Sequence, residues 1–400
     1  MRVVHVTPHL PPDQAANALL PFQLGAWAAA RGDSVHFIAH PSAAGAPDER
    51  PPATAGARNE RGDVQGPHAS EIGNVTWIPR TRRSLWQRTL RVGSIAGAWR
   101  IRRDTTDLIK TADIVHVHSN GLLPEVAAGM AHGLGKPVVL TLYGTEIWHY
   151  RKKALGPDLF TRAYTRADAV TFYSQGLLDR ARELGLDRPR CRVVYPPVAP
   201  SFTFHDDADQ QAERRDLGLT TTNLLVNVKR LHPLAGQRFL LEAMPEIVLE
   251  HPDTHLVVCG TGALLPELQA VARSTGVERH VTFAGLVDNA RVARYCAAAD
   301  LFILPSRLEA LPTVAVEALA SGTPVISSDN PGGVELHGVF GDDVAVVPKE
   351  QAAALAGAIR AALRQKRRTH PSTQTIVERR FRADAVARQY FEIYAEVMVG

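Results

Sequence analysis

The sequence predicts two doubly wound α/β domains in one chain. Short apolar runs of strand length alternate with helical runs up to residue 195, and a second alternating series extends from residue 224 to residue 347. Such alternation is typical of a parallel sheet covered by helices. Pro196, Pro197 and the polar stretch 204–209 separate the two series, which predicts a linker between them.

The first series begins with a strand at residues 3–6, a helix at 21–31 and a strand at 34–39. Residues 40–72 are rich in proline, alanine, glycine and charged residues without periodicity, which predicts a long flexible loop. The remaining strands of this series are predicted at residues 75–78, 114–118, 138–142, 169–173 and 192–195.

The second series predicts another parallel sheet, followed by an amphipathic helix at residues 383–398. We expect a first domain at 1–200, a second at 201–382 and a terminal helical segment at 383–400. The strands of the second series are predicted at residues 224–229, 255–259, 280–284, 301–304, 325–327 and 345–347.

The composition is that of an ordinary globular protein, with 45% hydrophobic and 22% charged residues in 400. No apolar run reaches the length of about 18 residues that a membrane-spanning helix needs. The chain enters a strand directly, and its three cysteines lack metal or disulfide spacing, so we expect a cytoplasmic protein without a signal peptide. A net charge of +4 without a basic and aromatic platform argues against nucleic-acid binding.

Two glutamates eight residues apart are the main candidates for a binding site. Glu309 follows the predicted strand 301–304, and Glu317 lies in a short helical run that ends at the turn 321–324. Ligands of an open parallel sheet bind outside the carboxyl ends of its strands, so both carboxylates should reach one crevice. A carboxylate accepts hydrogen bonds from two neighbouring hydroxyls, which suits a ligand that carries two sugars.

The stretch 301–336 resembles the E-x7-E signature of glycosyltransferase family 4, the retaining nucleotide-sugar transferases of the GT-B fold. The likeness includes the spacing of the two glutamates, the small-residue helix 315–320, the Gly-Thr-Pro turn and the pair Gly332-Gly333. The resemblance implies two Rossmann-like domains facing a central cleft. It also implies an acceptor-binding domain first, a donor-binding domain second, and a last helix that crosses back to the first domain.

The resemblance also implies how the sugar nucleotide is held. Glu309 would contact the transferred sugar and Glu317 the ribose diol. The amides at the start of the following helix, at Leu311, Thr313 and Val314, would hold the distal phosphate, because such amides are unpaired and favour anions.

The diphosphate site departs from the family pattern at one position. Arg230 matches the arginine that neutralises the diphosphate, and its guanidinium fork suits phosphate oxygens. The family lysine is replaced by Ala235, so either Lys229 supplies the missing charge or the phosphates are held less tightly. Gly262, in the loop after the strand 255–259, resembles a residue that lines the nucleotide pocket.

The acceptor side departs from the family as well. Tyr143 and Gly144 follow the strand 138–142, and Tyr143 stands where the family has a histidine beside the reacting sugar. Tyrosine does not titrate near neutral pH, so an imidazole at this site would have to come from His118. His116 shares a strand face with His118, and we expect it to be a core residue.

The family's glycine-rich loop after the first strand is absent. This chain has residues 8–17 in its place, and from their position there Asp13 and Asn17 are candidates for binding acceptor hydroxyls. The segment 85–103 has an apolar face flanked by arginines, which predicts a core-facing helix or, alternatively, a weak peripheral contact with an anionic membrane at its inner face.

The function that the resemblance implies is transfer of a hexose from a nucleotide diphosphate, with UDP-sugars as the first expectation. The acceptor would be a hydroxyl of a glycan, a lipid-linked saccharide or a small natural product. Neither a metal nor another cofactor is expected, because the acidic pairs 206–207 and 342–343 lie in polar, loop-like contexts without supporting ligands. Two alternatives stay open, a nucleotide-sugar-binding protein that has lost catalysis and a nucleotide-sugar epimerase on the same fold.

Overall fold

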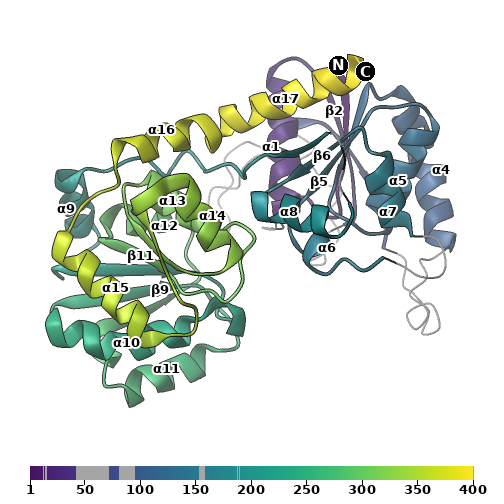
Figure 1. Ribbon diagram of the computed structural model, residues 1–400. Coiled ribbons are helices and arrows are strands. Elements are labelled where there is room, and N and C mark those ends of the chain that lie inside the picture. Colours follow the sequence, from purple (N-terminus) through teal and green to yellow (C-terminus); the bar gives the residue numbers. More distant parts are fainter. Residues whose placement is uncertain are drawn as a thin grey trace, which may run out of the picture. The chain divides into compact units, whose positions relative to one another are not determined.

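The computed structural model describes residues 1–11, 13, 16–41, 72–80, 95–152, 158–186, 188 and 190–399 (Figure 1). The chain divides into two compact units. One comprises Met1–Val194 with Ala387–Gly400, and the other comprises Tyr195–Val386. Most of the predicted loop 40–72 and the first ten residues of the segment 85–103 lie outside the described residues.

The first unit is built on a parallel sheet of seven described strands, in the order β3-β2-β1-β4-β5-β6-β7. The strands β4, β5 and β6 are buried at every position, as is usual for parallel strands covered by helices on both faces. The strands of this unit are β1 (Arg2–Val6), β2 (Ser34–Ala39), β3 (Asn74–Trp77), β4 (Ile114–His118), β5 (Val138–Leu142), β6 (Ala169–Phe172) and β7 (Cys191–Val193).

Helices cover both faces of this sheet, with α4, α5 and α7 on one face and α1 on the other (Figure 1). Two helices of this unit, α7 and α8, have a polar side chain that caps the amino-terminal end. Asp158 accepts a hydrogen bond from the Thr161 amide at the start of α7, and Ser174 accepts one from the Leu177 amide at the start of α8. The described helices are α1 (Ala16–Ala30), α4 (Ile95–Thr111), α5 (Leu122–Gly133), α6 (Thr145–Trp148), α7 (Leu159–Arg166), α8 (Gln175–Glu183) and the later part of α17 (Ala383–Val399).

The second unit contains a parallel sheet of six strands in the order β10-β9-β8-β11-β12-β13. The strands are β8 (Asn223–Val228), β9 (Thr254–Cys259), β10 (Val281–Gly285), β11 (Leu301–Leu304), β12 (Val325–Ser328) and β13 (Val344–Val347). The helices are α9 (Asp207–Asp216), α10 (Gln237–Glu250), α11 (Leu265–Ser274), α12 (Asn289–Ala298), α13 (Thr313–Ala320), α14 (Pro331–Phe340), α15 (Ala352–Gln365) and α16 (Pro371–Arg380).

The core of the second unit lies between its sheet and the layer formed by α10, α11 and α15 (Figure 1). Leu240, Met244 and Ile247 recur at helical spacing along α10 and are completely buried. They meet Ile303 of β11 and Ile359 of α15 in one apolar cluster. Burial of each such side chain contributes about 2 kcal/mol to the free energy of unfolding.

The structure confirms the predicted two series of parallel strands, and their bounds differ from the predicted ones by only one or two residues. The helix predicted at 21–31 begins earlier, at Ala16, because Pro21 lies inside it and does not start it. The stretch 204–209 is not a linker throughout, because Asp206 caps α9 by accepting hydrogen bonds from the Ala208 and Asp209 amides.

The prediction of a loop-like context for Asp343 is wrong as well. Its side chain has only 2% of its surface exposed, accepts hydrogen bonds from the His370 amide and the Thr373 hydroxyl, and pairs with Arg367. Asp343 therefore has a structural role in joining α16 to the segment before β13.

Each sheet reverses its strand order at one point. The reversal falls between β1 and β4 in the first unit and between β8 and β11 in the second. In open α/β sheets, ligands bind in the crevice outside the carboxyl ends of the two strands at such a point. The loops that follow β1, β4, β8 and β11 are therefore where a site is expected in each unit.

Candidate active site

The loop after β8 is held tightly against the loop after β9. The Lys229 amide donates to the Cys259 carbonyl, and the Leu231 amide donates to the Thr261 carbonyl, each at 3.0 Å. A Cβ atom at Gly262 would lie 2.1 Å from the Leu231 carbonyl oxygen. Glycine at this position is thus explained by close backbone approach, which fixes the path of the chain through Lys229 and Arg230.

The loop after β11 is fixed to its neighbours in the same way. The Arg307 amide donates to the Leu234 carbonyl at 2.8 Å, and the Gly332 amide at the start of α14 donates to the Glu309 carbonyl at 3.0 Å. The Asn330 side chain donates to the Ser306 carbonyl at 2.8 Å. Glu309 therefore occupies a backbone position that three loops define together.

Lys229 and Glu309 meet at the strand reversal of the second unit. The Lys229 Nζ atom lies 2.6 Å from Glu309 Oε1, and the side chains are 32% and 11% exposed. Arg230 is the next residue in the chain; it is exposed, and within the described residues its guanidinium forms no ion pair. Two cationic residues and one carboxylate thus follow the carboxyl ends of β8 and β11, where an anionic ligand with hydroxyl groups would be recognised.

Glu317 lies in α13, one helix further along the chain. Burial raises the pKa of this carboxyl to about 7. Thr313 and Val314 are the first residues of α13, so their amides have no carbonyl partner within the helix, whereas Leu311 precedes the helix. The prediction that all three residues start the helix is therefore wrong for Leu311.

In the first unit, a buried carboxylate shapes the loop after β5. Glu146 is 4% exposed, and it accepts hydrogen bonds from the Gly144 amide at 2.8 Å and the Tyr143 amide at 3.3 Å. Its other oxygen accepts a hydrogen bond from the Ser119 hydroxyl at 2.5 Å, in the loop after β4. Gly144 has φ 154°, a conformation that favours glycine. Glu146 thus joins the loops after β4 and β5 and sets the backbone of Tyr143.

The two strand histidines are both fully buried. His116 hydrogen-bonds the Tyr394 hydroxyl at 2.6 Å and the Thr141 hydroxyl at 2.7 Å, which confirms it as a core residue. His118 hydrogen-bonds the Tyr143 hydroxyl at 2.8 Å through Nδ1. Burial lowers the pKa of both imidazoles well below the usual value, so both are neutral at pH 7. His118 has no exposed surface and can influence a ligand only through Tyr143.

The loop after β1 places the two acceptor candidates differently. Asp13 pairs with His9, with Oδ2 and Nδ1 2.9 Å apart. Asn17 lies in the first turn of α1, and its carbonyl accepts a hydrogen bond from the Thr7 hydroxyl. Both residues follow the strand reversal of the first unit, where an acceptor site is expected.

A cavity of about 470 Å³ lies elsewhere in the second unit. It is lined by Leu301, Pro324 and Ala345, which are at the amino-terminal ends of β11, β12 and β13. Its arginines are already engaged, since Arg367 pairs with Asp343. Position and charge both separate this cavity from the candidate site.

Sequence reasoning missed Glu146 and His5. Glu146 was visible as the last residue of the Thr-Leu-Tyr-Gly-Thr-Glu segment that drew attention to Tyr143, but nothing in the spacing shows that its carboxylate turns back onto the loop. His5 pairs with His116 across β1 and β4, and its burial becomes apparent only from that pairing.

Comparison with known proteins covers both units. The family model of glycosyl transferases group 1 matches residues 209–378, and that of Glycosyltransferase Family 4 matches residues 22–202. A putative teichuronic acid biosynthesis glycosyltransferase, TuaC of Bacillus subtilis, is 34% identical over 280 residues, which are 67% of this chain and 67% of that protein.

A GDP-mannose-dependent alpha-(1-6)-phosphatidylinositol monomannoside mannosyltransferase of Mycolicibacterium smegmatis is 34% identical over 178 residues. The match covers 42% of this chain and spans less than half of that relative, 46% of its length. Among solved structures, Anabaena HepE in complex with UDP and glucose superposes with a TM-score of 0.71 at 18% identity, covering 99% of this chain and 100% of the other. That likeness shows the fold, two Rossmann-like units of the GT-B class.

Proposed function

The chain belongs to the group 1 and family 4 glycosyltransferases, and from this membership we propose that it transfers a sugar from a nucleotide diphosphate to a hydroxyl acceptor with retention of anomeric configuration. The observation that carries the proposal is the ion pair of Lys229 and Glu309 at the strand reversal of the second unit, where Arg230 is the next residue after Lys229. Cations suit the diphosphate, and a carboxylate suits the hydroxyls of the transferred sugar.

The proposed chemistry needs no covalent intermediate. Lys229 and Arg230 neutralise the charge that builds on the leaving diphosphate, and the first amides of α13 add hydrogen bonds to it. The leaving diphosphate takes the proton of the acceptor hydroxyl, which attacks from the same face. Glu309 and Glu317 hold the sugar and the ribose, so that the protein contributes position and charge.

On the acceptor side, the proposal assigns Tyr143 and Gly144 to the reacting centre and Asp13 and Asn17 to the acceptor hydroxyls. All four follow strands at the carboxyl edge of the first sheet. Metal independence belongs to the proposal too, and activity that survives EDTA would support it.

The test is release of the nucleoside diphosphate over a panel of GDP-mannose and UDP-sugars, for wild type, Glu309→Ala and Arg230→Ala. Release that both substitutions abolish supports a transferase and identifies the base. If the chain binds a nucleoside diphosphate but releases none from any sugar donor, neither by transfer nor by slow hydrolysis, the nucleotide-sugar-binding alternative is favoured. Conversion of the donor to its epimer would favour the epimerase. NMR of the glycoside product tests retention.

Donor affinity should rise with pH because of Glu317. Its pKa of about 7 means that the carboxylate form, which accepts hydrogen bonds from ribose hydroxyls, grows from a minor to a major fraction between pH 6 and pH 8. We expect the dissociation constant of the nucleoside diphosphate to fall about tenfold over that interval. Calorimetry of wild type and Glu317→Gln would measure this, and an equal slope in the variant would contradict the assignment.

The membrane contact remains a proposal about α4. In the described part of the segment, Ile95 and Trp99 are 77% and 62% exposed, while Ile101 is buried against the first unit. Arg103 stacks on the Trp99 ring at 5.2 Å. No helix among the described residues is long and apolar enough to cross a bilayer. We propose that this face binds anionic lipid weakly, so Trp99→Ala should reduce sedimentation with phosphatidylglycerol vesicles, and no sedimentation of wild type would exclude it.

A further inference from the structure

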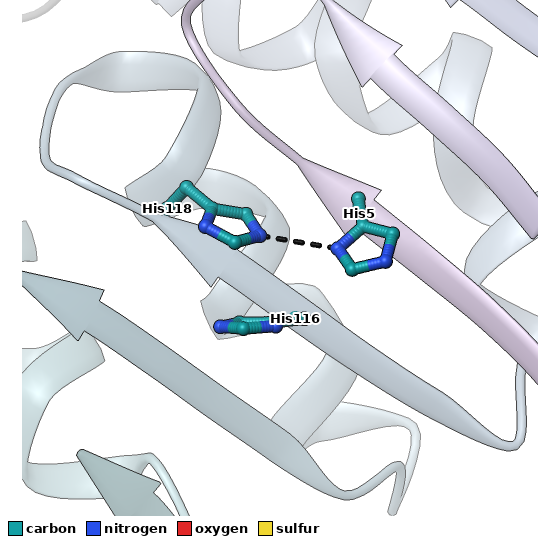
Figure 2. Close-up of side chains that lie close together, drawn as sticks. All are labelled: His5, His116 and His118. Carbon is teal, nitrogen blue, oxygen red and sulfur yellow. Dashed lines mark hydrogen bonds between the residues drawn. The ribbon is translucent and has the colours of Figure 1, made fainter. Parts of the chain in front are cut away.

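Three histidines lie side by side inside the first unit, on the two strands at its strand reversal. Figure 2 shows His5 of β1 with His116 and His118 of β4, with a hydrogen bond between His118 and His5. The His5 Nδ1 and His118 Nε2 atoms are 3.1 Å apart, and none of the three side chains has exposed surface.

The rings are not arranged to hold a metal ion, although a nitrogen of each lies within 4.8 Å of the others. His116 already uses both ring nitrogens in hydrogen bonds to hydroxyls. Its ring lies over that of His118 in a tilted arrangement, with centroids 3.9 Å apart and planes 32° apart. Imidazole lone pairs lie in the ring plane, so two rings that lie over each other direct their lone pairs poorly toward one ion.

The cluster instead forms a chain of hydrogen bonds that ends at Tyr143. His5 Nδ1 bonds His118 Nε2, and His118 Nδ1 bonds the Tyr143 hydroxyl. Burial lowers the pKa of His5 to about 3, and that of His118 falls well below the usual value. Each ring is therefore neutral at pH 7 and has one donor and one acceptor nitrogen, so the position of a single proton sets the direction of the whole chain.

The inner end of the chain decides that direction. Within the described residues, no hydrogen-bond partner reaches the buried Nε2 atom of His5. A buried N–H without an acceptor is rarer and costlier than a bare acceptor, so the proton of His5 belongs on Nδ1. His5 then donates to His118 Nε2. His118 in turn carries its own proton on Nδ1 and donates it to the Tyr143 oxygen.

The outer end follows from the same reasoning. Because the Tyr143 oxygen accepts from His118, the Tyr143 proton must point elsewhere. The ring of Tyr143 meets that of Tyr173 edge to face at 4.6 Å, and a hydrogen bond from Tyr143 lowers the pKa of Tyr173 against the larger effect of burial. An oxygen of a bound substrate can compete with Tyr173 for that proton.

We propose that His118 is a positioning residue of the transfer reaction, which in its Nδ1–H form makes Tyr143 a hydrogen-bond donor to an oxygen of the reacting sugar or of the acceptor. The inference rests on the proposed function, because it needs Tyr143 beside the reacting groups. Its content is specific to this chain, since Tyr143 stands where the resemblance places a histidine. His118 acts without touching substrate. Glu146 holds the loop that carries Tyr143, the hydrogen-bond partner of His118.

The first test reads the tautomers without requiring activity. Long-range 1H–15N correlation spectra of the full chain at pH 7 should show His5 and His118 in the Nδ1–H form, although free neutral histidine prefers Nε2–H. The signals of His5 and His118 are identified among those of the 16 histidines by their loss in His5→Asn and His118→Asn. An Nε2–H form for His118, or an imidazolium, would overturn the proposal.

The second test uses a matched pair of variants. Asparagine at 118 places an amide N–H where Nδ1 is and keeps the donor to Tyr143, whereas glutamine reaches the place of Nε2 and keeps only the contact with His5. We expect kcat of His118→Asn to exceed that of His118→Gln about tenfold, with an unchanged KM for the donor. The difference should vanish in a Tyr143→Phe background. Equal kcat values would reject the positioning role.

The outcomes separate the two levels of inference. If wild type transfers no sugar, the proposed function fails, and the catalytic part of this inference fails with it, while the spectra still decide the direction of the hydrogen bonds. Thermal unfolding shows whether both variants fold. If they do not, His5→Asn and His5→Gln repeat the comparison one step further from Tyr143. At position 5 only asparagine keeps the donor to His118 Nε2. We therefore again expect a higher kcat for the asparagine variant than for the glutamine variant.

Discussion

Replacing Glu309 by glutamine should reduce kcat/KM for sugar transfer about a thousandfold. The Glu309 carboxylate is 11% exposed and pairs with Lys229 at 2.6 Å. In the proposed complex it accepts hydrogen bonds from two sugar hydroxyls. Two charge-assisted hydrogen bonds at about 2 kcal/mol each correspond to about a thousandfold. The amide keeps the shape of the side chain, but it carries no charge and turns a donor toward one of the two hydroxyls, so neither charge-assisted hydrogen bond is kept.

A matched control separates this effect from loss of an ion pair as such. Glu213 of α9 pairs with Arg294 of α12 at 2.8 Å and is 22% exposed, so Glu213→Gln removes a comparable bridge from the same unit. We expect that variant to transfer sugar like wild type. Both variants should unfold within a few degrees of wild type, because partly exposed pairs contribute little to the free energy of unfolding. If Glu309→Gln transfers sugar as fast as wild type, the assignment of Glu309 to the donor site is contradicted.

The sequence predicted well those elements of the fold whose buried side chains are apolar. The strand 301–304 was predicted to the residue, because it is covered on both faces and forms a continuous apolar run. The helix α9 was missed because its packing is polar. Gln210 donates to the Ala299 carbonyl and Arg214 to the Ala298 carbonyl, so the buried face of this helix carries no hydrophobic period.

The candidate site divides in a similar way. Glu309 and Glu317 could be found, because their spacing and the strand before them are local features. The contact of Lys229 with Glu309 joins residues 80 positions apart in the chain, and it arises because β8 and β11 are neighbours at the strand reversal. Glu146 and His118 were assigned no partners, because buried polar side chains look like surface residues until the loops they hold are known.

Replacing Lys229 by methionine should weaken binding of the nucleoside diphosphate about thirtyfold. That is the value of one charge-assisted hydrogen bond of about 2 kcal/mol. Methionine keeps the stem of the side chain and removes only the charge. Lys366→Met is the matched control, because Lys366 bonds the Thr222 carbonyl and lines the cavity at the opposite edge of the sheet. Calorimetry should find wild-type affinity in the control, and a wild-type affinity in Lys229→Met would contradict the assignment.

The decisive variant returns the charge to the family position. Ala235 is 2% exposed in a short 3-10 turn, and the next residue, Gly236, has φ 68° and approaches the Pro305 carbonyl so closely that a Cβ atom would lie 2.0 Å from its oxygen. The turn is therefore fixed against the end of β11. If Lys229 replaces the lost lysine, Lys229→Met with Ala235→Lys should recover most of the affinity that Lys229→Met loses. Failure of a folded double variant to recover it would mean that a lysine at position 235 cannot replace Lys229, and that the charge must stand at position 229, where it contacts Glu309.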